Sequence, residues 1–294
     1  MREQFEMVEG QQMPPTIFVK KERWYREKPL FATAFLVLIL FGCFACDLIM
    51  TKDPTYLDLK NFDVAPNCEF LFGTDTMGRD IFSMIWYGGR ISLMIGIGAT
   101  VISTLAGILF GAVSGSLPEW ADALLMRLTE ILLSVPSLLI VVLVQAILGK
   151  ANVWSISFVI GITSWMSIAK VVRTEVRQLN SREYVIASRC MGGGFFHVLW
   201  KHLTPNFISS IMFMVIMNIR NAIVAESTLS FMGLGLSVEE ISWGSMLSLA
   251  ENALLTNSWW MILIPGLFLL ATLLCFTSLG NHLRRNANRK ESNL

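Results

Sequence analysis

Long apolar runs separated by shorter polar stretches dominate the chain. Crossing a hydrocarbon layer of about 30 Å takes roughly 20 residues of helix, and six runs approach or exceed that length. They cover residues 30–50, 91–115, 124–148, 154–172, 207–234 and 259–279. We therefore predict an all-α integral membrane protein with six transmembrane helices, the third of them kinked at Pro136.

The distribution of lysine and arginine predicts how these helices are oriented. The N-terminal tail, the stretch between the fourth and fifth runs, the start of the third run and the C-terminal tail together hold 17 of them, against 5 on the opposite side. Basic residues accumulate in cytoplasmic loops. We therefore expect residues 1–29 and 284–294 to be cytoplasmic tails of a transmembrane domain formed by residues 30–283.

The longest external segment, residues 51–89, has a glycine-bearing stretch, Gly73-Thr74-Asp75-Thr76-Met77-Gly78-Arg79-Asp80. This stretch is no phosphate-binding loop, because it lacks the G-K-[ST] ending. It predicts a turn followed by a capped amphipathic helix. Apolar and aromatic residues at 81–87 place this helix at the membrane interface, where tryptophan and tyrosine are enriched.

Composition narrows the range of functions. The chain is 54% hydrophobic and only 15% charged, whereas soluble domains carry about 25% charged residues. A net charge of +1 gives no sign of nucleic-acid binding. His197 and His202 are five residues apart, unlike the pair on a zinc-binding helix, and no P-loop motif occurs. We expect no catalytic residue, no metal site and no ATP bound by this chain.

Residues 180–206 form a polar and basic stretch between two predicted helices. Asn180 followed by Glu183 predicts an N-cap with its capping-box partner, and then a short helix that ends where glycines 192–194 interrupt it. A second amphipathic segment ends at Pro205, and its apolar side consists of Phe195, Phe196, Leu199 and Trp200. Two short helices joined by a glycine turn suit docking into a groove of another protein, or they form an ordinary amphipathic loop on the membrane surface.

The fifth run is the most polar of the six. It contains Asn218, Arg220, Asn221, Glu226, Ser227, Thr228 and Ser230. At 100° per residue, Asn218, Asn221 and Thr228 share one helix face and Arg220 lies on the opposite one. The polar face either lines a solvated path for a polar substrate or bonds to neighbouring helices at a subunit interface. For the path we also predict Arg220 and Glu226 as further members.

Several motifs together resemble the permease subunits of ABC importers. Residues 180–206 are similar to the EAA loop of that family: Glu183-Tyr184-Val185 precede its core, Ala187 and Gly192 match it, and Pro205-Asn206 close it. Residues 73–93 are similar to the G-T-D-x-x-G-R-D and S-x-x-x-Y-G-x-R-x-S-L runs of the peptide and nickel branch. Residues 226–235 are similar to its E-x-x-L-S-F-L-G-L-G run.

The resemblance implies a type I (MetI-like) importer architecture in the bacterial inner membrane, with a cytoplasmic coupling helix and an external interfacial helix. It implies that the coupling stretch contacts an ATPase through Glu183, Tyr184, Ala187, Gly192, Phe195, Phe196, Trp200 and Pro205. The implied partners are a second, homologous permease, one or two ATPase subunits that bind ATP and Mg²⁺, and an extracytoplasmic solute-binding protein. The implied substrates are di- or oligopeptides, with nickel or a metal chelate as the alternative.

A membrane-embedded enzyme or a non-transporting assembly factor is the interpretation from a different class of protein. Co-purification separates the two, because a transporter subunit is expected to bring an ATPase and another six-span protein with it. An enzyme has no need of either partner.

Overall fold

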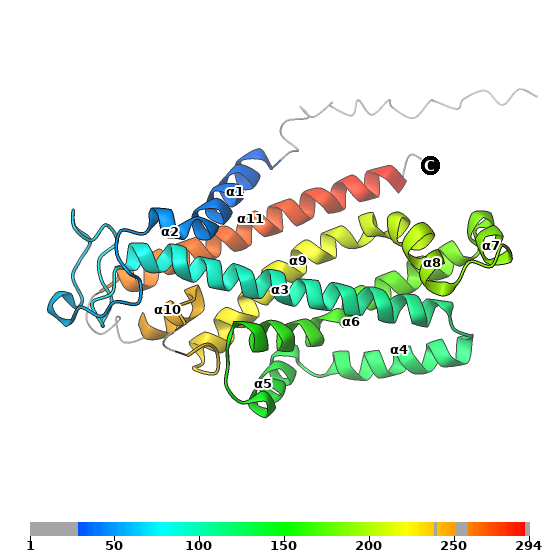
Figure 1. Cartoon of the computed structure of the whole chain (residues 1–294), viewed down its shortest axis with the longest axis horizontal. Coiled ribbons are helices and arrows are strands. Elements are labelled where there is room, and N and C mark those ends of the chain that lie inside the picture. The colour runs from blue at the N-terminus through cyan, green and yellow to red at the C-terminus, as the bar shows by residue number, and fades with distance from the viewer. Residues whose placement is uncertain (1–28, 238–239, 251–257, 292–294) are drawn as a thin grey trace, which may run out of the picture.

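The computed structural model describes residues 29–237, 240–250 and 258–291. The predicted N-terminal tail lies outside this part of the chain, apart from its last residue. Within the described residues the protein is helical, and the only β-type pairing is an isolated bridge between Thr74 and Asp80. Figure 1 shows long helices running along one axis, with the loop of residues 51–80 and α10 (Trp243–Leu249) at one end and α7 (Glu183–Cys190) at the other. We call these the loop end and the α7 end.

Four long helices form the centre of the bundle: α3 (Ile81–Ser116), α6 (Val153–Asn180), α9 (Thr204–Phe231) and α11 (Trp260–Glu291). Small residues allow α3 and α6 to pack closely, as is common between helices in lipid. At Gly111 an added Cβ would lie 2.5 Å from the carbonyl oxygen of Ala169. Because α11 continues to Glu291, it enters the stretch that was predicted to be a C-terminal tail.

The first apolar run is broken, in contrast to the prediction of one span over residues 30–50. It forms α1 (Leu30–Phe44) and the short α2 (Cys46–Ile49), separated at Ala45. A helix of 15 residues rises only about 22 Å at 1.5 Å per residue. Alone, α1 is therefore shorter than the hydrocarbon layer.

The third run is interrupted more strongly than the predicted kink. It forms α4 (Glu119–Ser134) and α5 (Ser137–Leu148), whose axes differ by 90°. Pro136 is the N-cap of α5, and Val135 before it has an extended backbone, as the steric demand of a following proline favours. The proline thus separates two helices where a bend within one helix was expected.

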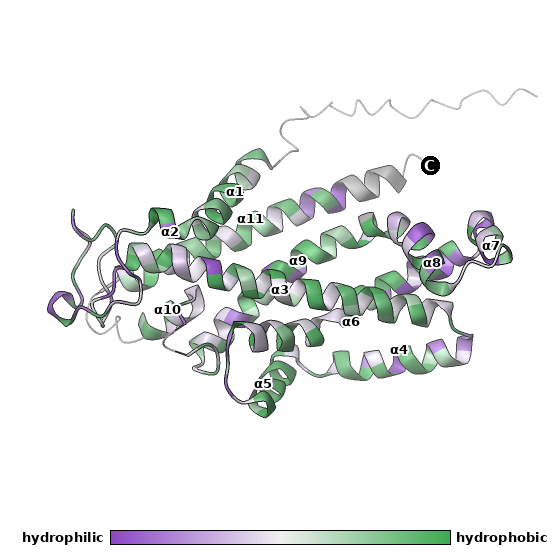
Figure 2. Cartoon of the chain, in the orientation of Figure 1, coloured by the Kyte–Doolittle hydropathy of each residue, from purple (hydrophilic) through white to green (hydrophobic). Residues whose placement is uncertain are grey.

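Four described helices are long and apolar enough to cross a membrane, and a fifth span results if α4 and α5 are counted together. They are Ile81–Ser116, Val153–Asn180, Ser210–Phe231 and Trp260–Arg285. Figure 2 shows hydrophobic residues along these helices, and hydrophilic ones in the 51–80 loop and around α7. The chain is therefore a multi-pass helical membrane protein, and the count of six spans stays a prediction that requires α1 as well.

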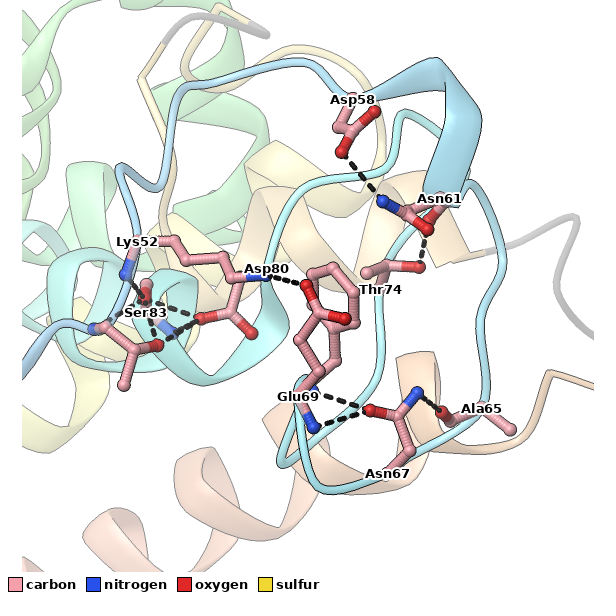
Figure 3. A network of polar contacts seen from close by, with 11 residues as sticks. Lys52, Asp58, Asn61, Ala65, Asn67, Glu69, Thr74, Asp80 and Ser83 are labelled. Atoms are coloured by element: carbon pink, nitrogen blue, oxygen red, sulfur yellow. Dashed lines mark hydrogen bonds and ion pairs between the residues drawn. The ribbon is translucent and has the colours of Figure 1, made fainter.

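The 51–80 loop is held by its own polar side chains (Figure 3). Thr74 Oγ1 donates to the carbonyl of Asn61 at 2.6 Å and accepts from the backbone N–H of Val64 at 2.8 Å. Asp80 caps α3, since its side chain accepts from the backbone N–H of Ser83. The prediction of a capped helix after the turn is therefore confirmed, although this helix is not a separate interfacial element.

The predicted interfacial helix is instead the first part of α3, which continues without a break to Ser116. Two glycines in its path, Gly88 and Gly89, serve packing. An added Cβ at Gly89 would lie 2.6 Å from the Trp243 ring, and one at Gly88 would lie 3.2 Å from the backbone of Ser242. The absence of side chains at Gly88 and Gly89 allows α10 to approach α3 closely, a contact that sequence periodicity could not indicate.

Candidate functional site

Residues 180–206, the predicted coupling stretch, include α7, α8 (Phe195–Val198) and a π-helical turn, Leu199–Leu203. This turn leads directly into α9. Pro205 lies in the first turn of α9, where its missing N–H costs no hydrogen bond. The prediction that the second segment ends at Pro205 is therefore wrong, because the chain continues from it into α9.

The predicted N-cap at Asn180 is wrong, although the glycine break is present. Asn180 is the last residue of α6, and Arg182 precedes α7 without a side-chain cap. The Asn180 side chain instead donates to the carbonyl of Gly115 at 3.3 Å and accepts from Arg189 at 2.8 Å. Gly192, with φ of +86°, makes the turn between α7 and α8.

The predicted coupling residues lie together at the α7 end, and most of them are exposed. The exposed ones are Glu183, Tyr184, Ala187, Gly192, Phe196, Trp200 and Pro205, while Phe195 is half-buried. Phe196 and Trp200 are 64% and 50% exposed, so two large apolar side chains have no cover within the described chain. Leu199 is the exception to the predicted apolar side, because it is fully buried.

An apolar cluster beneath this surface connects it to the long helices. Val185 of α7, Val198 of α8 and Leu199 pack with Phe207 of α9 and Val176 of α6, all at 2% exposure or less. Burial of each such side chain contributes about 1.5–3 kcal/mol. The buried sides of α7 and α8 are therefore packed directly against α6 and α9.

A buried charge cluster lies nearby, and the sequence analysis did not predict it. The carboxylate of Asp122 on α4 accepts from Arg173 at 2.8 Å and from Ser114 at 2.5 Å, and it forms an ion pair with Arg177 at 2.8 Å. Arg173 and Arg177 were noted only as markers of orientation. Their spacing of four residues on α6 predicts a shared face, which was the available signal, but nothing in the sequence pointed to Asp122 as the partner.

A cavity of about 600 Å³ lies between the α4–α5 break, α6 and α9. Asn218, Asn221 and Thr228 line it from α9, so the structure brings the predicted polar face together at one cavity. Thr163, Ser164 and Ser167 line it from α6, and no charged residue is among the described residues that form its wall. The cavity therefore presents neutral hydroxyl, amide and apolar groups.

Two residues predicted for the path, Arg220 and Glu226, do not line this cavity. Arg220 donates to Asn221 at 3.0 Å and to Thr277 of α11 at 3.4 Å. Glu226 is completely buried and accepts hydroxyl hydrogen bonds at distances of 2.6–3.4 Å from Ser92, Ser227, Ser230 and Ser242. Glu226 therefore lies where α3, α9 and the segment before α10 pack together.

Comparisons with known proteins identify the family. Residues 107–289 match the model of the binding-protein-dependent transport system inner membrane component. The chain belongs to this family. A putative peptide permease from Brucella suis is 36% identical to this chain over 256 residues, which cover 87% of this chain and 84% of the relative.

Two relatives from Bacillus subtilis are similar over comparable lengths. The dipeptide transport system permease protein DppC is 33% identical to this chain over 274 residues, which cover 92% of this chain and 85% of the relative. The oligopeptide transport system permease protein OppC is 37% identical over 249 residues, covering 85% and 81%. The permease is thus a non-catalytic membrane subunit of an ABC importer, which operates with ATPase and binding-protein partners, and the enzyme alternative is excluded.

Proposed function

We propose that this permease forms half of the translocation path of an importer for di- or oligopeptides and couples that path to a cytoplasmic ATPase through α7 and α8. The second half of the path comes from a homologous permease. One or two ATPase subunits bind ATP and Mg²⁺, and an extracytoplasmic solute-binding protein delivers the substrate.

The observation that carries the coupling role is the exposed surface at the α7 end. Phe196, Trp200 and Tyr184 are exposed, while Val185, Val198 and Leu199 of the same stretch pack into the apolar cluster of α6 and α9. Large aromatic side chains of this kind are enriched at the centres of protein interfaces. A surface exposed on one side and anchored on the other is suited to receive a force and pass it to the spans.

The direction of the helices supports a topology with both termini in the cytoplasm. In Figure 1, α3, α6 and α11 run from the loop end to the α7 end, and α9 runs back. With α1 and the α4–α5 pair as two further crossings, the proposed six passes would leave both termini on the side of α7. Lys and Arg are concentrated on this side, so the α7 end is cytoplasmic.

The cavity supports peptides over nickel ions as the substrate. Its wall offers hydroxyl and amide groups that hydrogen-bond to peptide amides, together with apolar side chains that accommodate different residues. Stable binding of a transition-metal ion favours imidazole, thiolate or carboxylate ligands. The wall has none of these among its described residues. The names of the similar permeases, which include peptide, dipeptide and oligopeptide permeases, agree with this choice.

The proposed mechanism is alternating access. When the ATPases close on ATP, they displace α7 and α8, and the apolar cluster beneath them moves α6 and α9. The cavity between α6, α9 and the α4–α5 break then opens to one side of the membrane and closes to the other, as expected for rocking of bundles around a central site.

The coupling role is tested by replacing Phe196 and Trp200 with alanine and measuring how much ATPase co-purifies with the permease. Removal of an interface hot spot costs about 2 kcal/mol or more, which is a loss of affinity of roughly 30-fold. Peptide uptake should fall with it, while the amount of permease in the membrane stays unchanged because both side chains are exposed.

Trp154→Ala is the matched control, because Trp154 is 74% exposed but lies in the first turn of α6, at the opposite end of that helix from α7. It should leave ATPase association at the level of the unsubstituted protein. Undiminished ATPase binding by the double variant would refute the docking role. Uptake of labelled nickel without uptake of labelled peptide, in cells that express the complete importer, would refute the choice of substrate.

A further inference from the structure

Glu226 is a completely buried carboxylate in the middle of the packing between three elements. Its two oxygens accept hydroxyl hydrogen bonds from Ser242 at 2.6 Å, from Ser230 at 2.9 Å and from Ser92 of α3 at 3.2 Å. A buried carboxyl group of this kind is tolerated only where hydrogen bonds compensate its burial. The serine hydroxyls therefore offset the cost of burying Glu226, and their hydrogen bonds to Glu226 also fix the positions of the serines.

Two of these serines also organise α10. Ser242 is the N-cap of α10 and forms a capping box with Ser245. Ser92 accepts the backbone N–H of Trp243 at 3.2 Å. Gly244 lies so close to α9 that an added Cβ would be 2.5 Å from Cα of Ser227. Glu226 thus joins the start of α10 to α9 and α3 at one point.

Contacts beyond α10 continue to the 51–80 loop. The Trp243 ring donates to the carbonyl of Ile85 on α3 at 2.9 Å, and the Trp260 ring donates to the carbonyl of Thr74 in the loop at 3.2 Å. Both tryptophans belong to one apolar cluster with Ile81 and Ile85. A displacement of the loop end therefore reaches Glu226 through packed and hydrogen-bonded groups.

On the other side of Glu226 lies the cavity. Ala225 and Thr228, its neighbours on α9, line the cavity wall, whereas Glu226 faces away. We propose that Glu226 is a positioning residue that makes α10 and the loop end move together with the cavity-lining face of α9. Resting on the proposed function, this assigns Glu226 to the response of the permease to the solute-binding protein at the loop end, and not to contact with the peptide.

The test measures ATPase activity of the complete importer in lipid nanodiscs as peptide-loaded binding protein is added. Ser242→Ala removes the 2.6 Å bond to Glu226, and Glu226→Gln replaces one accepting oxygen with an amide nitrogen but keeps the shape of the side chain. Each should raise the half-saturating concentration of binding protein about tenfold, the effect of losing one buried hydrogen bond. Glu226→Ala should raise it further, so the glutamine variant is a partial rescue.

Ser237→Ala is the control, because Ser237 lies between α9 and α10, as Ser242 does, but its side chain is exposed. It should leave the half-saturating concentration unchanged. A merely structural role of Glu226 would lower the yield of assembled complex and the maximal rate while the half-saturating concentration stays constant, and that result would overturn the proposal. If the unsubstituted importer shows no stimulation by binding protein, the proposed function itself fails.

Discussion

The two ends of the permease are stabilised in different ways. At the loop end, polar groups are buried and paired within the chain: Asp75 with Arg79, Thr74 with the backbone, and Glu226 with its serines. At the α7 end, large apolar side chains such as Phe196 and Trp200 are exposed, and the short helices that carry them are held by an apolar cluster. Several buried polar groups of the loop end thus have partners within the chain, although Tyr56, Leu59 and Phe62 of that end are exposed as well. The short helices of the α7 end are held by apolar packing instead.

This difference predicts two classes of substitution: those that lower the stability of the permease and those that weaken its association with the ATPase. Changes at the loop end remove partners of buried groups, so they should lower the stability of the permease itself. Changes at the α7 end should mainly affect association with the ATPase. Three further substitutions test the comparison.

The largest loss of stability is expected for Asp75→Ala. Asp75 and Arg79 form an ion pair at 2.6 Å with side-chain exposures of 8% and 3%, and Asp75 also accepts the backbone N–H groups of Met77 and Arg79. Loss of one partner leaves a buried charge unpaired, which costs about 3–5 kcal/mol. Thermal unfolding of the purified permease in nanodiscs would show the lower midpoint.

The exposed pair between Lys52 and Glu69, at 2.9 Å in the same loop, provides the control for this prediction. Glu69→Gln should change stability by at most about 1 kcal/mol, because surface ion pairs contribute little. Equal effects of the two substitutions would contradict the role of burial at the loop end.

A smaller but still substantial loss is expected for Gly78→Ala. Gly78 has φ of +75°, and an added Cβ would lie 1.8 Å from the carbonyl oxygen of Asp58. Backbone strain and overpacking together cost about 2–4 kcal/mol. The same unfolding measurement detects this change, and an unchanged midpoint would show that the loop adapts more easily than the close approach to Asp58 implies.

The smallest effect is expected for Gly192→Ala at the α7 end. Gly192 has a similar φ of +86°, but no heavy atom lies within 4 Å of an added Cβ. Only the left-handed conformation is penalised, at about 1 kcal/mol. A bulky side chain at Gly192 should lower ATPase coupling in a transport assay more than it lowers stability, and the reverse order would place Gly192 in the fold and not in the docking surface.

Much of the fold could be predicted because apolar runs and glycine turns are local signals. The runs at 154–172 and 207–234 lie within α6 and α9 apart from the last three residues of the second, and the glycine turn at Gly192 separates α7 from α8. Asn180 was misassigned as a cap because α6 continues to this residue beside Gly115, a tertiary contact. The close approach of Ser242 and Trp243 to Gly88 and Gly89 is likewise a contact between segments distant in sequence.

The candidate sites were predictable to different degrees for the same reason. Helical periodicity placed Asn218, Asn221 and Thr228 on one face, and all three line the cavity. Periodicity could not show that Glu226 faces Ser242, or that Asp122 meets Arg173, because these partners come from other elements. Side chains that bond across elements require the packing to be known first.

The break at Pro136 has a consequence for what the cavity can recognise. Residues 132–138, on both sides of the break, line the cavity, and the ends of helices leave main-chain carbonyl and N–H groups without helical partners. Within a membrane, irregular backbone of this kind is tolerated where it borders a water-filled space. If this cavity is the translocation path proposed above, a peptide passing through it would meet main-chain groups that no side-chain substitution removes. These groups would replace its hydrating water whatever its sequence.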